Sequence, residues 1–225
     1  MTRAARRAGA AGILLGCALA PAGASAQRIV SGTALVSLVE HRVDIGYGVE
    51  ESSGLLAGAE GALHLGRRLV LGMRAAGGSL TTEATGAQNR DLGELGIQAS
   101  VDPAPWLALR SAATWRTYTT PVARQRWTLV EIGAEARLDF ASGPVRGVLR
   151  GGLLPVVSVK GLPGPDVALT AAAGIEYRSR SLTSGLFYGL ERYDFPDMGP
   201  GGPQRLEQVS SLTFRFTIQR GLRRA

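Results

Sequence analysis

The 225-residue sequence contains very few of the residues from which metal sites, disulfide bonds and activated nucleophiles are built. Cys17 is its one cysteine, and His41 and His64 are its two histidines. A lone cysteine cannot form an internal disulfide, and two histidines without further cysteines give no recognisable zinc-ligand spacing. We therefore expect no metal site and no cofactor.

Lysine is almost absent as well, since Lys160 is the only one and arginine supplies nearly all of the positive charge. The formal net charge is +7, from 25 basic and 18 acidic residues. Arg3, Arg6 and Arg7 lie in a segment that we expect to be removed, and 25 − 3 leaves 22 basic against 18 acidic residues, a balance of +4. Such a mild and dispersed charge argues against a nucleic-acid partner.

No apolar run reaches the 18 or so residues that a transmembrane helix requires. The N-terminus instead has a basic stretch at 1–7, an apolar stretch at 10–20, and a small-residue cleavage site at Ala24-Ser25-Ala26. This order predicts a secretory signal peptide over 1–26, cleaved after Ala26. Two alternatives stay open: an N-terminal helix of the mature protein, and a lipoprotein signal in which Leu14-Leu15-Gly16-Cys17 is a lipobox.

The clearest pattern in the chain is an alternation of apolar and polar residues between 130 and 159. Every even position from Val130 to Phe140 is apolar, and the odd positions include Glu131 and Asp139. A period of two indicates a β-strand with one apolar and one polar face. Ala-Ser-Gly-Pro at 141–144 is typical of a turn, and the alternation resumes after it. The stretch therefore predicts a β-hairpin.

The same alternation recurs along the chain between four short turns centred near 67, 103, 142 and 180, about 36 to 39 residues apart. Longer connections lie between them, at 50–54, 80–91, 119–125, 160–166 and 194–203. This rhythm predicts an antiparallel meander of ten strands, near 40–50, 54–65, 69–79, 91–101, 106–118, 126–140, 145–159, 166–177, 182–193 and 207–219. We expect an all-β fold, a single antiparallel up-and-down transmembrane β-barrel, with eight or twelve strands as the alternatives. It occupies 39–219 and is followed by a tail at 220–225; residues 27–38 either extend the first strand or form a loose segment.

The distribution of charge favours a membrane barrel over a soluble periplasmic sandwich or ligand-binding barrel, although both would alternate. One face of each strand is apolar, for example Val43, Ile45, Tyr47 and Val49 in the first. Charges of both signs occupy the opposite faces at mid-strand, as a polar lumen requires. Aromatic residues lie toward the strand ends, as in interfacial girdles: Phe140 and Tyr177 beside short turns, and Trp115, Tyr118, Trp127, Tyr188 and Tyr193 toward the long loops.

The charged rows predict a lumen network of paired ions. Its expected members are Arg42, Asp44, Glu60, Arg74, Glu94, Arg110, Arg116, Glu131, Glu135, Arg137, Arg146, Arg150, Glu176, Glu191 and Arg215. Buried charges must be paired to be tolerated, so we expect a structural plug of ion pairs. The alternative is a narrow pore whose arginines favour anions.

The last alternating segment, Leu212-Thr213-Phe214-Arg215-Phe216-Thr217-Ile218, resembles the terminal strand of small bacterial outer-membrane β-barrel proteins, the broad group that includes OmpA-type barrels. The resemblance implies an outer-membrane location, contact with outer-membrane lipids, and recognition of this strand by the barrel-assembly machinery. It also implies a structural, surface-interaction or narrow-pore role; the partner of the surface loops is not specified.

The second functional alternative is a barrel enzyme, a lipid-modifying enzyme or a protease. Outer-membrane enzymes of these kinds use a histidine with a carboxylate near the outer rim. His64 and Glu60 share one strand face at i and i+4, but the pattern places both His41 and His64 toward the turn ends of their strands, the opposite rim. We therefore expect no catalytic residues.

Overall fold

The computed structural model describes residues 28–66, 68–83, 88–140, 143–197 and 202–222, and these form ten β-strands. The expected signal peptide, Cys17, the cleavage site and the last three residues of the tail lie outside the described residues. The strands are β1 (Arg28–Asp44), β2 (Val49–Leu65), β3 (Leu69–Thr82), β4 (Arg90–Ala104), β5 (Leu107–Thr119), β6 (Arg124–Asp139), β7 (Val145–Val159), β8 (Val167–Arg178), β9 (Leu182–Asp194) and β10 (Leu206–Leu222). Within the described ranges, no helix is long and apolar enough to cross a membrane.

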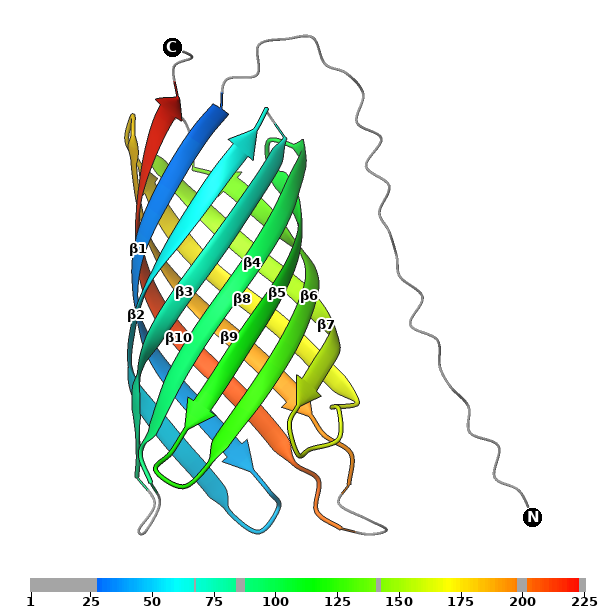
Figure 1. Cartoon of the computed structure of the whole chain (residues 1–225). Coiled ribbons are helices and arrows are strands. Elements are labelled where there is room, and N and C mark those ends of the chain that lie inside the picture. The colour runs from blue at the N-terminus through cyan, green and yellow to red at the C-terminus, as the bar shows by residue number, and fades with distance from the viewer. Residues whose placement is uncertain (1–27, 67, 84–87, 141–142, 198–201, 223–225) are drawn as a thin grey trace, which may run out of the picture.

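The strands close into one barrel in which each strand pairs with its neighbours in sequence and β1 pairs with β10 (Figure 1). Every pairing is antiparallel. Each odd-numbered strand ends, and the next strand begins, at what we name the loop end, which is at the bottom of Figure 1. The strands from β2 to β8 with even numbers end at the opposite end of the barrel, which we name the turn end. The predicted up-and-down barrel of ten strands is confirmed.

The first hairpin differs from the prediction. Strand β1 begins at Arg28, so the segment whose structure was left open belongs to the sheet, and residues 50–54 lie in β2 rather than in a connection. The chain turns at 45–48 instead, where Gly46 has a φ of +79°. Its N–H donates to Asp44 Oδ1 at 2.8 Å. The apolar alternation of Val43, Ile45, Tyr47 and Val49 continues through this turn, so the sequence pattern does not reveal where the first strand ends.

Apolar side chains cover the outer surface of the barrel along most of its height. Leu55, Met73, Leu153 and Ile175 are 57–63% exposed, although each lies in the middle of its strand. A continuous apolar surface of this extent requires a hydrocarbon environment, as in transmembrane barrels. Among the outward aromatics, Trp115 lies toward the loop end and Phe140 and Tyr177 lie at the turn end, as residues of interfacial girdles do. Tyr188 was expected toward the loop end as well, but it is the middle residue of β9.

Glycines allow β2 and β3 to approach closely on the inner face. A Cβ on Gly78 would lie 2.0 Å from the Leu55 carbonyl oxygen, and one on Gly54 would lie 2.1 Å from the Ser79 carbonyl oxygen. Any larger residue at these two positions therefore collides with backbone. Gly54 and Gly78 are needed for the local curvature of the sheet.

A register shift between Val130 and Ile132 changes which β7 residues face inward. On the turn-end side of the shift the even positions point into the lumen, as Arg150 and Leu154 do. On the loop-end side the odd position Val159 is buried at 4% exposure. The neighbouring even positions therefore point outward there.

Candidate functional site

The candidate site is the interior of the barrel, which contains most of the charged residues expected there. The alternation of register and burial places thirteen of the fifteen on the inner face, namely Glu60, Arg74, Glu94, Arg110, Arg116, Glu131, Glu135, Arg137, Arg146, Arg150, Glu176, Glu191 and Arg215. These residues could be predicted from the sequence because a charged side chain at mid-strand of a membrane barrel must face the lumen rather than lipid.

Arg42 and Asp44 are the two exceptions, and their expected place in the lumen network is wrong. Arg42 pairs with Glu51 at 3.2 Å on the outer face, where the two side chains are 49% and 44% exposed. The inner positions of β1 are the odd ones, such as Leu35 and Val39. The prediction took the apolar row that continues through the first turn as the outer face of this strand, and therefore assigned Arg42 and Asp44 to the inner face.

Glu135 is the hub of the network near the turn end, because three arginines donate to its carboxylate. The distances are 2.6 Å from Arg150 Nε to Oε2, 3.2 Å from Arg110 Nη1 to Oε2, and 2.8 Å from Arg137 Nε to Oε1. Arg137 also donates to Asp102 Oδ2 at 3.0 Å. One carboxylate thus holds the side chains of β5, β6 and β7 in a fixed arrangement.

Arg116 is the centre of a second cluster nearer the loop end. Its Nε donates to Glu94 Oε1 at 2.6 Å, and its Nη1 and Nη2 donate to the two Glu191 oxygens at 2.7 and 2.9 Å. The Tyr193 hydroxyl donates to Glu191 at 2.6 Å, and Arg74 lies 3.6 Å from Glu94. Arg116 is 5% exposed. Its guanidinium therefore ties β5 to β4 on one side and to β9 across the lumen on the other.

Glu60 joins the remaining charges. It pairs with Arg215 from β10 and accepts a 2.6 Å hydrogen bond from Gln98, which in turn accepts from Arg110 at 2.8 Å. The phenyl ring of Phe187 lies nearby, with the guanidinium carbons of Arg150 and Arg215 at 5.3 and 5.7 Å from its centroid. Both distances are within the range of a cation–π contact.

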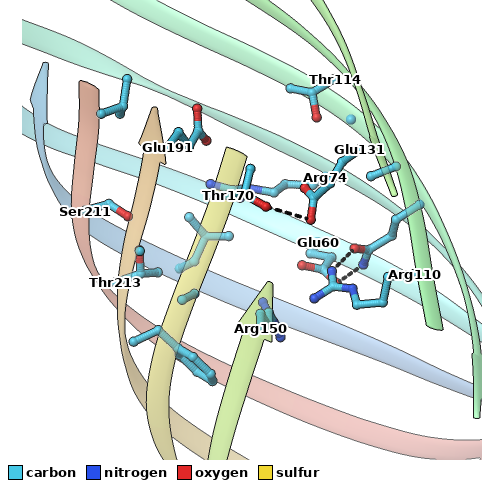
Figure 2. A pocket seen from close by; sticks show the side chains of 18 of the residues that line it. Glu60, Arg74, Arg110, Thr114, Glu131, Arg150, Thr170, Glu191, Ser211 and Thr213 are labelled. Atoms are coloured by element: carbon cyan, nitrogen blue, oxygen red, sulfur yellow. Dashed lines mark hydrogen bonds between the residues drawn. The ribbon is translucent and has the colours of Figure 1, made fainter. Parts of the chain in front are cut away.

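Cavities remain among these side chains. One of about 220 Å³ is bordered by Glu60, Arg110, Arg150 and Glu131, the last of which accepts from Thr170 at 3.3 Å (Figure 2). Another, of about 200 Å³, lies toward the turn end beside His64 and Glu176. Polar cavities of this size hold several water molecules.

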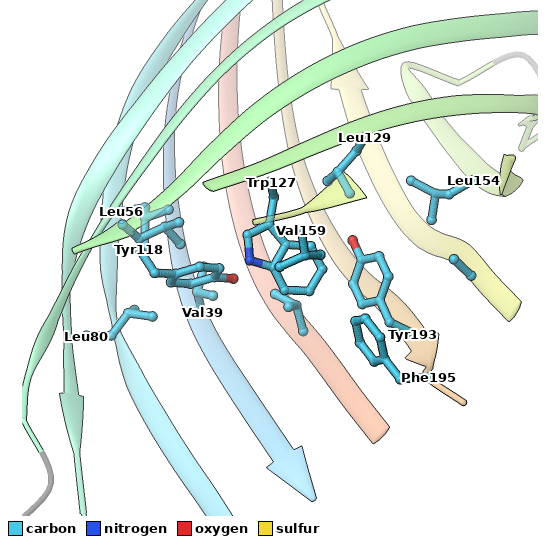
Figure 3. Close-up of a cluster of buried hydrophobic side chains, with 13 residues drawn as sticks. Val39, Leu56, Leu80, Tyr118, Trp127, Leu129, Leu154, Val159, Tyr193 and Phe195 are labelled. Atoms are coloured by element: carbon cyan, nitrogen blue, oxygen red, sulfur yellow. The ribbon is translucent and has the colours of Figure 1, made fainter. Parts of the chain in front are cut away.

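An apolar cluster fills the lumen at the loop end, and we name it the plug. Its members are Val39, Leu56, Leu80, Leu92, Tyr118, Trp127, Leu129, Leu154, Val159, Ala168, Tyr193, Phe195 and Val209 (Figure 3). Trp127 lies at its centre, with ring centroids 5.1 Å from Tyr193, 6.2 Å from Phe195 and 6.3 Å from Tyr118, all edge-to-face. Tyr193 and Phe195 are at most 1% exposed.

The plug corrects part of the aromatic prediction. Tyr118, Trp127 and Tyr193 were expected near the interfacial girdle at the loop end, but they are 0–4% exposed inside the barrel. They occupy inner positions of their strands, where they pack against other inward apolar side chains such as Leu80, Leu92 and Phe195. A signal was present in the sequence: apolar residues occupy both faces in the loop-end half of some strands, as in Leu55-Leu56 and Leu153-Leu154.

His41 lies beside the plug, at the loop end and not at the turn end as expected, because β1 begins twelve residues before the predicted strand. Its Nε2 lies 3.0 Å from Glu207 Oε2, and the two side chains are 2% and 0% exposed. Its ring stacks on Tyr118 at 4.8 Å. Arg205 Nε donates a second hydrogen bond to Glu207 at 2.7 Å. Sequence reasoning missed this pair, since Glu207 belongs to the far end of the chain.

His64 does lie near the turn end, but it does not pair with Glu60. Its Nε2 is 3.4 Å from the Ser31 hydroxyl, and the Glu60 carboxylate is occupied by Gln98 and Arg215. Among the residues that the structure describes, no three His, Cys, Asp or Glu side chains gather as metal ligands would.

Comparisons with known proteins agree with the fold. No protein-family model matches the sequence, and no curated protein matches it. Among solved structures, the outer membrane protease OmpT from Escherichia coli superposes with a TM-score of 0.56 at 8% sequence identity, over 87% of this chain and 97% of that one. The translocator domain of the autotransporter NalP from Neisseria meningitidis superposes with a TM-score of 0.45 at 14% identity, over 88% of this chain and 89% of that one. The likeness to OmpT shows that this chain has the fold of a bacterial outer-membrane β-barrel.

Proposed function

We propose that the protein is an integral outer-membrane barrel whose lumen is sealed, and that its role is structural or lies in presenting its loop end to the outside. The observation that carries this proposal is the plug. Trp127, Tyr193 and Phe195 meet inside the barrel at the loop end, and the Arg116–Glu191 ion pair spans the lumen beside them. An ion entering from the turn end would reach packed hydrocarbon.

The narrow anion-selective pore is less well supported. An anion path needs arginines that are free to exchange partners, whereas Arg110, Arg116, Arg137, Arg150 and Arg215 each pair with a carboxylate. The paired charges line cavities of about 220 and 200 Å³ on the turn-end side of the plug.

Catalysis is also less well supported, although one solved structure with this fold is a protease. The nearest approach to a catalytic pair is His41 with Glu207, and both side chains are shut off from solvent. A substrate would have to displace Tyr118, which stacks on the His41 ring. A shared fold at 8% sequence identity does not imply that this chain shares the protease activity of OmpT.

The outer surface and the last strand indicate how the protein is held in its membrane. The outer face of β10 presents Leu212, Phe214, Phe216 and Ile218, each 39–55% exposed. We propose that this face contacts outer-membrane lipids in the folded protein and is read by the barrel-assembly machinery before folding. A closer relationship to OmpA-type barrels is part of the same proposal.

Conductance in planar lipid bilayers tests the sealed lumen directly. We expect the folded wild-type protein to give no stepwise current, while a Trp127→Gly, Tyr193→Ala, Phe195→Ala triple variant admits ions. Heat-modifiable gel migration verifies that each sample is a closed barrel. Stepwise current from the wild-type protein would contradict the proposal and support the pore.

A further inference from the structure

Charged side chains on the outside of the barrel lie mostly near the loop end, beyond the apolar belt. Two arginines among these charges have a partner of opposite sign on the same surface. Arg42 pairs with Glu51 at 3.2 Å, and Arg192 pairs with Asp194 at 2.9 Å. Each of these two arginines is therefore neutralised by a neighbouring carboxylate.

The sector of β6 and β7 is different, because it brings like charges together. Lys160 directly follows β7, and its N–H donates to the Arg126 carbonyl oxygen at 3.0 Å. This bond continues the register from the Trp127–Val159 pair, so Arg126 and Lys160 lie directly opposite each other. Arg124 is two residues from Arg126 on the same face, and all three are exposed. We name these three residues the basic patch.

The basic patch has no partner within the sheet. Among the described residues, none of its three members forms an ion pair. Its neighbours across β5 are hydroxyls, since Thr117 lies opposite Arg126 and Thr119 lies opposite Arg124. The nearest outward carboxylate in the register is Asp91, opposite Thr119 and one strand further on, and it accepts from Ser79.

The height of the basic patch on the barrel matches a lipid headgroup. Trp115, an outward girdle residue with 44% exposure, lies opposite Thr128, two residues from Arg126. At about 3.4 Å per residue, the Arg126 position is roughly 7 Å beyond this tryptophan. Below it, Val130 pairs with Val156 and continues the apolar surface. Like charges directly opposite each other in a sheet are destabilising unless an anion lies between them.

We propose that the basic patch binds the phosphate group of an anionic lipid headgroup in the leaflet that surrounds the loop end. The Arg126 guanidinium can donate two parallel hydrogen bonds to phosphate oxygens, and Lys160 supplies a point charge from the adjacent strand. Thr117 can donate a further hydrogen bond. A lipid fits better than a free ion because the acyl chains would lie against the apolar surface beneath the patch.

Lipid retention measured by native mass spectrometry of the detergent-solubilised full chain tests this assignment. We expect the wild type to retain phosphatidylglycerol in preference to phosphatidylcholine, and an Arg126→Gln, Lys160→Gln double variant to lose that preference by roughly tenfold. Arg192→Gln, which removes an outward arginine that pairs with Asp194, is the matched control and keeps it. Heat-modifiable migration confirms folding of each variant.

Two outcomes would overturn the proposal. The first is equal retention of phosphatidylglycerol by the wild type and the double variant, or by Arg192→Gln and the double variant. The second is competition by millimolar inorganic phosphate as effective as that of the lipid, which would make the patch a site for a free anion. Should the double variant not fold, Lys160→Gln alone and a salt titration of the wild type give the same contrast, because electrostatic retention weakens with ionic strength.

Discussion

Arg116 of β5 and Glu191 of β9 form a two-pronged ion pair across the barrel interior, with N–O distances of 2.7 and 2.9 Å. Three strands, β6, β7 and β8, separate the two residues around the wall in one direction. The pair therefore braces opposite walls rather than neighbouring strands. Because the pair lies next to the plug, it helps to close the lumen.

Removing one member of this pair should destabilise the barrel strongly. Arg116→Ala leaves Glu191 without its ion-pair partner and Glu94 with only the longer contact to Arg74, and breaking such a buried pair costs about 3–5 kcal/mol. Arg42→Gln is the matched control, since the exposed Arg42–Glu51 pair is worth less than about 1 kcal/mol. Urea unfolding in detergent micelles measures both. Similar unfolding midpoints for the two variants would show that the cross-lumen pair does not contribute to the stability of the barrel.

Trp127 should be essential to the plug for its volume and not for its N–H. Trp127→Ala leaves a cavity among Tyr118, Tyr193 and Phe195 and should cost about 3–5 kcal/mol. The Trp127 Nε1 atom is buried without a hydrogen-bond partner. Trp127→Phe removes this donor and keeps an aromatic ring, so we expect a much smaller loss. The temperature of the heat-modifiable gel shift distinguishes the two; equal losses would contradict the packing argument.

Gly78→Ala should prevent the close approach of β2 and β3. The added methyl would meet the Leu55 carbonyl oxygen at 2.0 Å, and forced overpacking of this kind costs about 1–3 kcal/mol or more. Gly61→Ala is the control on the same pair of strands, because a Cβ there meets nothing within 4 Å. The yield of refolded barrel in lipid vesicles should fall for Gly78→Ala and not for Gly61→Ala. Full refolding of both variants would show that the strands can separate freely.

The two histidines should differ sharply in their contribution to stability. His41→Ala removes a partner of the fully buried Glu207 carboxylate, and leaving such a group short of hydrogen bonds costs about 1–3 kcal/mol. His64 touches Ser31 only at 3.4 Å, so His64→Ala should change stability by less than about 1 kcal/mol. Urea unfolding compares them. Assays of peptide and lipid A turnover accompany it, and a loss of turnover in either variant would support the enzyme alternative.

The sequence could predict most strands because one alternation pattern serves them all. From β3 to β10, every predicted boundary lies within three residues of the observed one, since each strand has a lipid-facing apolar row that stops at turn residues. The first hairpin was misplaced because Ile45 and Tyr47 continue the alternation through the turn. A period of two cannot distinguish a strand from a tight turn that happens to keep the same spacing.

The interior could be predicted only in part, because alternation tells which face a residue occupies and not what it meets there. It placed Glu135 and Arg150 inward, and they do pair. It could not reveal that Arg116 reaches Glu191 across the lumen as well as Glu94 on the neighbouring strand, since that depends on the width of the barrel. It also could not tell that Trp127 lies inside, because a tryptophan near a strand end suits a girdle and a plug equally well.

The pairing of β1 with β10 extends over seventeen positions, from Arg28 opposite Leu222 to Asp44 opposite Leu206. These partners come from the two extremes of the sheet in sequence, so this ladder can form only when the last strand has been made. Until then the nascent meander has two unsatisfied edges, each ready to pair with another chain. Slow closure and a need for protection against aggregation on the way to the membrane follow from this one ladder.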